Sequence, residues 1–198
     1  MLNKKVKFFG IIVLFISLAI TMSACDMGGN GVETDNGDEV IWDFYSGTDF
    51  GFDYPSEWIT TSNHEQLNLY QAFFGDMYSS GIIAGPSTEF EKLFMIISLN
   101  VEEYQDYPIN NADLNDFISS FHQTHTEVTD AVLVEESSLA IDGNPAIELI
   151  YEYTEDKASW IATYQGYKFY LIAYGCDKTE YNNMLSLFRE IRDSISLY

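Results

Sequence analysis

Two histidines three residues apart are the first side chains in this sequence that could act together chemically. His122 and His125 follow a stretch with helical periodicity, so both imidazoles can reach one side of a helix and, in principle, one Zn²⁺ ion. A catalytic zinc site generally takes three protein ligands, and no third ligand has convincing spacing. We therefore expect both histidines to face solvent at the end of a helix, and we predict no metal and no other cofactor. His64 lies in a polar stretch and supports no site.

Paired carboxylates, the groups used in general acid–base catalysis, are also present. Glu102-Glu103 and Glu135-Glu136 are examples, but the chain has 31 acidic residues, so adjacent acids are expected from composition alone. A glycosidase needs two carboxyl groups on either side of a cleft, and one sequence cannot locate that cleft. The sequence has no nucleophile elbow, phosphate loop, dinucleotide fingerprint or metalloprotease helix motif. We predict no catalytic residues and a protein that is not an enzyme; the alternative is an envelope-associated hydrolase with an unrecognised site.

Aromatic side chains could stack on sugar rings where they lie in loop-like segments, as Tyr78, Tyr104 and Tyr107 do. Most other aromatic residues alternate with polar ones and fit a sheet core. Cys176 ends an apolar run, where a cysteine is commonly a small buried hydrophobic group. We therefore do not expect a reactive thiol there, because a stable thiolate needs a cationic neighbour or a helix N-terminus.

The first 25 residues have the organisation of an export signal. Three lysines precede an apolar run from Phe8 to Ile20, which is shorter than the roughly 20 residues of a spanning helix. The run leads to Met22-Ser23-Ala24-Cys25, which resembles the bacterial lipobox. That resemblance implies cleavage before Cys25 and acylation of this cysteine, and two acyl chains anchor a protein stably. We predict a lipoprotein on the extracytoplasmic face of a bacterial cell membrane, with residues 1–24 as its signal peptide.

The mature chain is strongly acidic. Six of the nine Lys and Arg residues follow Ala24, against all 31 Asp and Glu residues, so the formal charge is −25. Nucleic-acid binding requires clustered cations, so this class of partner is excluded. Acid in such excess favours solubility near an anionic envelope. We expect two kinds of partner, the membrane through the lipid on Cys25 and an envelope protein or complex.

Residues 25–40 are rich in Gly, Asn and acid, and we expect them to form a flexible tether. Within it, Asp35-Asn36-Gly37-Asp38 lacks the spacing and the closing glutamate of a calcium-binding loop. Residues 41–198 are of the usual size for one domain.

Hydrophobic periodicity predicts the elements of this domain. Alternation predicts strands over 50–54, 93–101, from Val132, and over 147–153, 159–164 and 167–176, with turns at 142–145 and 165–166. The 0, 3, 4, 7 spacing predicts a helix over 113–125 with Asp113 as its N-cap, and a closing helix over 179–197. Phe94 and Ile96 on the second face of 93–101 should be covered by a helix. We expect an α+β domain, a twisted antiparallel sheet with helices packed on it.

Three segments of this pattern resemble the PsbP-like fold, which includes the extrinsic P subunit of photosystem II and the Mog-type proteins. They are the aromatic strand with Tyr-Pro and tryptophan at 50–58, the turn with Gly, Asn, Pro and Ala at 139–146, and the last strand and helix at 167–195. In the closing helix this chain has Ser194-Ile195 where the family usually has Ser-Phe. The resemblance implies a PsbP-like domain over residues 41–198 with a binding or accessory role, because members of this fold are mostly non-enzymatic.

Overall fold

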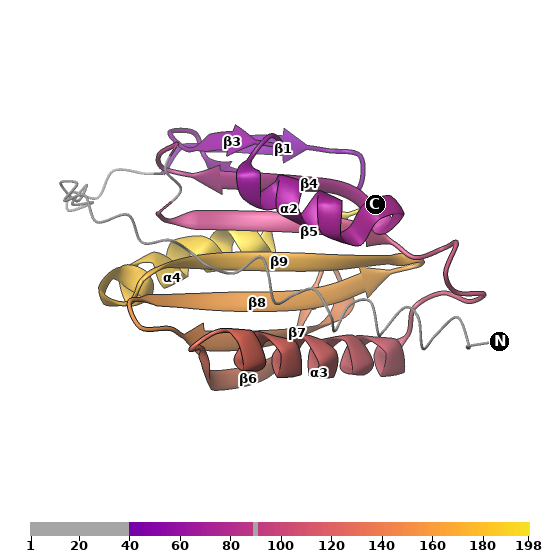
Figure 1. Cartoon of the computed structure of the whole chain (residues 1–198). Helices are drawn as coiled ribbons and strands as arrows, with labels where there is room; N and C mark the ends of the chain where they lie inside the picture. Colours follow the sequence, from indigo (N-terminus) through magenta and orange to yellow (C-terminus); the bar gives the residue numbers. More distant parts are fainter. Residues whose placement is uncertain (1–39, 89–90) are drawn as a thin grey trace.

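A seven-stranded antiparallel sheet runs through the centre of the structure, a computed structural model that describes residues 40–88 and 91–198 (Figure 1). Its spatial order is β3-β4-β5-β9-β8-β7-β6. The strands are β3 (Ile59–Thr61), β4 (Tyr78–Gly85), β5 (Leu93–Asn100), β6 (Val132–Ile141), β7 (Asn144–Glu152), β8 (Asp156–Gln165) and β9 (Lys168–Asp177). The mixed architecture confirms the predicted α+β class, with helices packed on an antiparallel sheet.

Two helices cover one face of this sheet, and Figure 1 shows both in front of it. The first, α2 (Glu65–Phe74), continues into a short 3₁₀ helix, η2 (Gly75–Met77), and contacts β4. The second, α3 (Asn111–Val128), contacts β7 and β8. Because alternate strand residues point to opposite faces, Met95 and Ile97 of β5 belong to the core beneath these helices.

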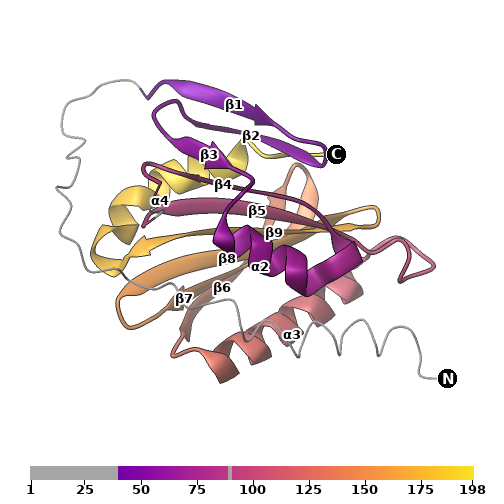
Figure 2. The ribbon, with the colours of Figure 1, turned by 45° about the horizontal axis from the view of Figure 1, so that its top comes forward.

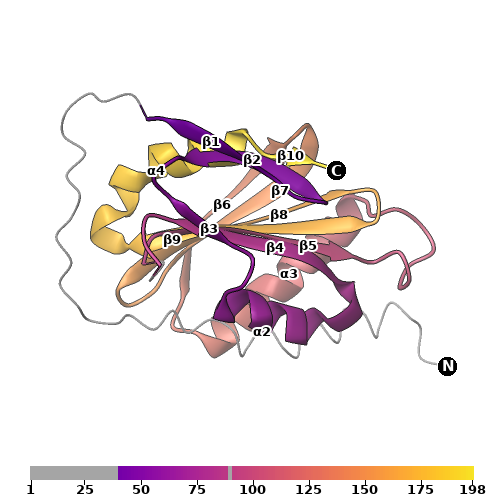
Figure 3. The ribbon, with the colours of Figure 1, turned by 90° about the horizontal axis from the view of Figure 1, so that it is seen from above.

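The opposite face carries a small sheet and one helix, as Figure 3 shows from above. The small sheet has the order β1-β2-β10, with β1 (Trp42–Ser46), β2 (Phe50–Pro55) and β10 (Ser196–Leu197). Helix α4 (Lys178–Asp193) contacts β9, β8 and β2. The expectation that a helix covers Phe94 was incomplete, because the ring of Phe52 in β2 lies 5.4 Å from that of Phe94. Trp58 is buried, with its ring 6.3 Å from that of Phe188.

The ends of the predicted helices differ from those in the structure. The N-cap of α3 is Asn110 and not Asp113; its side chain accepts from the N–H of Asp113, whose carboxylate accepts from the N–H of Asn110. This reciprocal pair is a capping box, so Asp113 is its third helical residue. The closing helix stops at Asp193, because Ser194 accepts a hydrogen bond from the N–H of Asp53 and the next residues pair with β2.

Two tight hairpins occur close to their predicted places. Asp142 and Gly143 have φ of 49° and 76°, and they connect the paired residues Ile141 and Asn144. Positive φ at both central residues is the geometry of a primed two-residue turn, which matches strand twist. The second turn lies at 166–167, one residue later than predicted, with Gly166 at a φ of 61°.

Candidate functional site

The two histidines of α3 each lie against a tyrosine hydroxyl supplied from β7 or just after it. His122 Nδ1 is 2.9 Å from the hydroxyl of Tyr151, and His125 Nε2 is 2.7 Å from that of Tyr153. The indole N–H of Trp160 also donates to Tyr153, at 3.3 Å. His125 has no exposed surface, so the prediction that it faces solvent was wrong. The two-residue spacing of the tyrosines along the extended chain and the three-residue spacing of the histidines on the helix bring these groups together.

Three members of this cluster, His125, Tyr151 and Tyr153, are uncharged near neutral pH. Burial lowers the pKa of His125 to about 4, and His122 contributes in the same direction. Burial also raises the pKa of Tyr151 and Tyr153 above the ordinary tyrosine value. No group of three metal-binding side chains occurs in the described part of the chain. The arrangement joins α3 to the sheet through hydrogen bonds between the two histidines and tyrosine hydroxyls.

A second polar network lies on the other face, beneath α4. Glu148 is 4% exposed, and its Oε1 accepts from the hydroxyls of Ser159 and Tyr174, both at 2.5 Å. Arg192 of α4 is 4.0 Å from its other oxygen. Burial, with Glu148 as a further cause, raises the pKa of Tyr174 to about 12. Sequence reasoning missed this glutamate; the available signal was its place between Ala146 and Ile150, which face the same core.

A buried aspartate joins the two sheets. Asp49 accepts from Ser80 Oγ at 2.6 Å and forms an ion pair with Lys168 at 2.7 Å. Burial raises its pKa, but the hydrogen bonds from Lys168 and Ser80 outweigh that effect, so the pKa lies below the usual range. Lys168 and Tyr170 also donate to the C=O of Tyr198. The charge therefore stabilises the junction between the sheets.

The other residues considered from sequence are dispersed. Cys25 lies outside the described residues, so its acylation stays a prediction. Cys176 is buried as expected, and burial raises the pKa of its thiol to about 12. Glu102 and Glu103 are exposed in the turn after β5. Tyr78 begins β4 and is half-buried, whereas Tyr104 and Tyr107 lie half-buried between β5 and α3.

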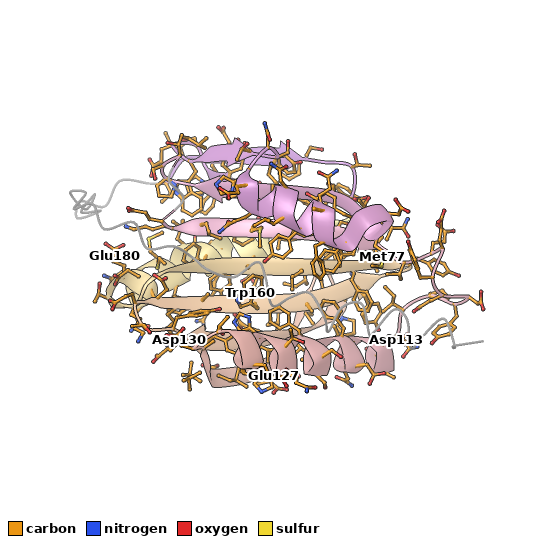
Figure 4. The ribbon with its side chains drawn as sticks, in the orientation of Figure 1. Met77, Asp113, Glu127, Asp130, Trp160 and Glu180 are labelled. Carbon is orange, nitrogen blue, oxygen red and sulfur yellow. The ribbon has the colours of Figure 1, made fainter. Side chains whose placement is uncertain are left out.

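The exposed surface contrasts with these buried networks. Large apolar side chains are exposed at Val132 and Val134 on β6. Figure 2 shows the small sheet as a separate layer with α4 behind it. Two more large apolar side chains are exposed on or next to this small sheet, at Phe44 and Tyr198. Figure 4 labels Asp130 and Glu127 close to the end of α3 that leads into β6, so acid adjoins this edge. Apolar and acidic side chains are therefore exposed together at the β6 edge.

No helix in residues 40–88 and 91–198 is long and apolar enough to cross a membrane.

Comparison with known proteins identifies the architecture. A family model described as PsbP-like protein matches residues 19–197. The solution structure of cyanobacterial PsbP (CyanoP) from Synechocystis superimposes with a TM-score of 0.58 at 17% identity, covering 87% of this chain and 99% of that chain. LpqN of Mycobacterium tuberculosis, described as involved in cell envelope biogenesis, has a TM-score of 0.49 at 10% identity and covers 81% and 86%. No curated protein matches the chain.

Proposed function

The chain belongs to the PsbP-like protein family, and from that premise we propose that it is a binding or accessory module for an envelope protein. A lipid on Cys25 holds the domain on the extracytoplasmic face of the bacterial membrane. Residues 25–40 form the tether between that lipid and the folded domain.

The observation that supports a binding role is that the polar networks are buried, whereas apolar side chains are exposed on the surface. Glu148 and Asp49 have hydrogen-bond partners within the domain, and so does Nε2 of His125, whereas the buried Nδ1 of His125 has none among the described residues. By contrast, Val132 and Val134 are 61% and 46% exposed on the last strand of the large sheet. Exposed apolar side chains beside unpaired strand backbone are a feature of surfaces that bind other chains. A catalytic role would instead require convergent titratable groups that substrate can reach.

The lipid anchor is tested by Cys25→Ser, with Cys176→Ser as the matched control. Wild-type protein and the control should incorporate labelled palmitate and stay with the membrane fraction. The Cys25→Ser protein should carry no acyl group and be unprocessed or released. A wild-type mature protein that begins at another residue, or that lacks acyl mass, would contradict the anchor.

The binding role is tested by crosslinking in intact membranes followed by affinity capture and mass spectrometry. Wild type should yield the same envelope protein in independent preparations, and the released Cys25→Ser protein should yield less of it. Absence of any reproducible crosslinked protein would overturn the binding role. Turnover of envelope-derived esters or glycosides by the purified domain would instead favour a hydrolase.

A further inference from the structure

We infer that β6 is an open sheet edge that accepts a cationic, extended segment of the partner protein as an additional antiparallel or parallel strand. This inference rests on the proposed binding role and specifies the surface and the chemistry of the partner. β6 spans ten residues and is last in the order of the seven-stranded sheet, with β7 as its one paired neighbour among the described strands. Figure 1 shows it at the lower edge of the sheet.

The backbone groups that β6 offers to a partner follow from its register. Ile141 and Asn144 flank a two-residue turn, so they form a hydrogen-bonded pair, and such pairs alternate along the strand. The N–H and C=O groups of Ala140, Ser138 and Glu136 therefore point away from β7. Pro145, opposite Ala140, supports this assignment, because its C=O accepts from Thr163 on β8, the other side of β7.

The far half of β6 is also shaped for close approach and is held in position. Residues 137–140 carry Ser, Ser, Leu and Ala, none of them charged or bulky enough to block a neighbouring backbone. The hairpin tip is fixed, because the carboxylate of Asp142 accepts from the N–H of Leu197 at 3.0 Å and Ile141 is buried. A partner strand would thus bind a strand that is already rigid, so binding would not cost the conformational entropy of ordering β6. The near half differs, since the register shifts between Leu133 and Glu135.

The acidic side chains on and near β6 favour a cationic partner strand. Glu135 and Glu136 are exposed on β6, Asp130 and Glu127 are exposed just before it, and residues 127–141 contain no Lys or Arg. In the described part of the chain neither Glu135 nor Glu136 forms an ion pair, whereas the nearby Arg192 and Lys157 are each within 4.0 Å of a glutamate of β7. Two copies of this edge would repel each other, which disfavours self-association. A strand that carries Lys or Arg would instead gain cross-strand ion pairs.

The remaining edges are less suitable. β3 has three residues and β10 two. β1 has five residues, half the length of β6. We therefore place strand addition on β6 and over Glu136–Ile141 in particular.

A direct test uses synthetic peptides of about nine residues, a usual strand length, in which valine alternates with lysine or, as a control, with glutamate. Amide hydrogen exchange of the domain at low salt should slow at Glu136, Ser138 and Ala140 with the lysine peptide and be unchanged with the glutamate peptide. Glu135→Lys with Glu136→Lys should reverse this preference. Equal protection by both peptides, protection centred elsewhere, or none with either would overturn the inference.

A second variant isolates the backbone contribution. Ser138→Pro removes one outward N–H, and proline is tolerated on a strand edge where its missing N–H would have faced solvent. We expect a melting temperature close to wild type and affinity for the lysine peptide reduced about tenfold, the effect of one lost hydrogen bond, whereas Ser138→Ala should bind like wild type. If Ser138→Pro fails to fold, the peptide and charge-reversal measurements alone decide the matter. Wild-type binding by folded Ser138→Pro would contradict strand addition.

The two proposals fail in different ways. If wild type captures an envelope protein from membranes and the charge-reversed protein captures it equally well, the partner binds elsewhere and only the β6 inference is wrong. If the charge-reversed protein loses that partner and the crosslinked segment is cationic, both proposals are supported. If nothing is captured reproducibly and neither peptide binds, both are wrong.

Discussion

At the residue scale, burial of polar groups decides how this domain responds to pH. His125 is enclosed by the rings of Phe121, Tyr151 and Trp160, with centroids 5.2, 4.5 and 6.0 Å away. Such surroundings disfavour a charged imidazole, which explains the direction of its pKa shift. The neutral ring still needs a hydrogen-bond partner, and Tyr153 provides it.

Acid should therefore destabilise the domain through His125. Its pKa is about 4 in the folded chain against 6.5 ordinarily, so between these values the unfolded chain binds more protons. The contribution of His125 to the free energy of unfolding is complete above pH 6.5. It falls as pH decreases towards 4, by about 3 kcal/mol in all. Urea unfolding at several pH values should show this slope in wild type and in a His64→Gln control, and a shallower slope in His125→Gln. Identical slopes in all three proteins would show that His125 is not buried as described.

Glu148 provides a test of the second network. Glu148→Ala leaves the hydroxyls of Ser159 and Tyr174 without their acceptor in a buried site, so the free energy of unfolding should fall by about 3 kcal/mol. Glu148→Gln keeps an acceptor and should cost less. The exposed Glu136→Ala should change it by less than about 0.5 kcal/mol. Thermal melts of the three variants decide this, and a Glu148→Ala protein as stable as the Glu136→Ala control would refute the network.

At the element scale, the N-terminus of α3 depends on its cap. Asn110→Ala removes the acceptor for the N–H groups of Ala112 and Asp113, so stability should fall by about 1 kcal/mol. Asn115→Ala, exposed within the same helix, should raise stability by about 0.5 kcal/mol because alanine has the higher helix propensity. Denaturant titration distinguishes the loss of stability expected for Asn110→Ala from the gain expected for Asn115→Ala. A neutral Asn110→Ala would assign the cap to another residue.

Elements with strong periodicity were predictable from sequence, and the others were not. β5, β8 and β9 are apolar enough to be identified, as are the buried positions of α3. Helix α2 escaped prediction because the apolar Leu69, Ala72 and Phe73, which are exposed or half-buried, obscure the helical spacing of its buried residues Leu67, Tyr70 and Phe74. β10 could not be separated from the preceding helix, since Ile195 and Leu197 continue the apolar pattern while their pairing depends on β2, far away in sequence.

The polar networks show the same limit. A single sequence reveals that His122 and His125 share a side of one helix, but not that Tyr151 of β7 and Tyr153 just after it lie beneath them. Likewise the sequence does not distinguish Glu148 from other glutamates in strands, because its partners Arg192 and Tyr174 come from distant segments. What sequence did indicate correctly was the burial of Cys176. The open edge of β6 depends on strand order, which only the fold supplies.

At the scale of the whole molecule, the end of the chain closes the fold. Leu197 is buried and pairs with Phe50, and the backbone of Tyr198 bonds to Asp49, Lys168 and Tyr170. A chain that ends at Ile195 should lose about 3 kcal/mol of stability through this burial and these hydrogen bonds. Tyr198→Ala keeps the backbone contacts and should lose less than about 1 kcal/mol. Equal melting temperatures for the truncated and full chains would contradict this role.

The position of β1 has a mechanical consequence. β1 is an edge strand, it pairs with β2 from Trp42↔Pro55 inwards, and the predicted tether joins it at that open end of the hairpin. If the lipid holds the tether while a partner holds β6, tension enters at residue 40 and loads the hydrogen bond between Ile41 and Ser56 first, and then the pair Trp42–Pro55. The paired residues of β1 and β2 would then separate one after another, at a lower force than the seven-stranded sheet can bear. Release of residues 40–49 would add about 30 Å of extended chain, so that β1 acts as an extensible spring between the membrane and the bound partner.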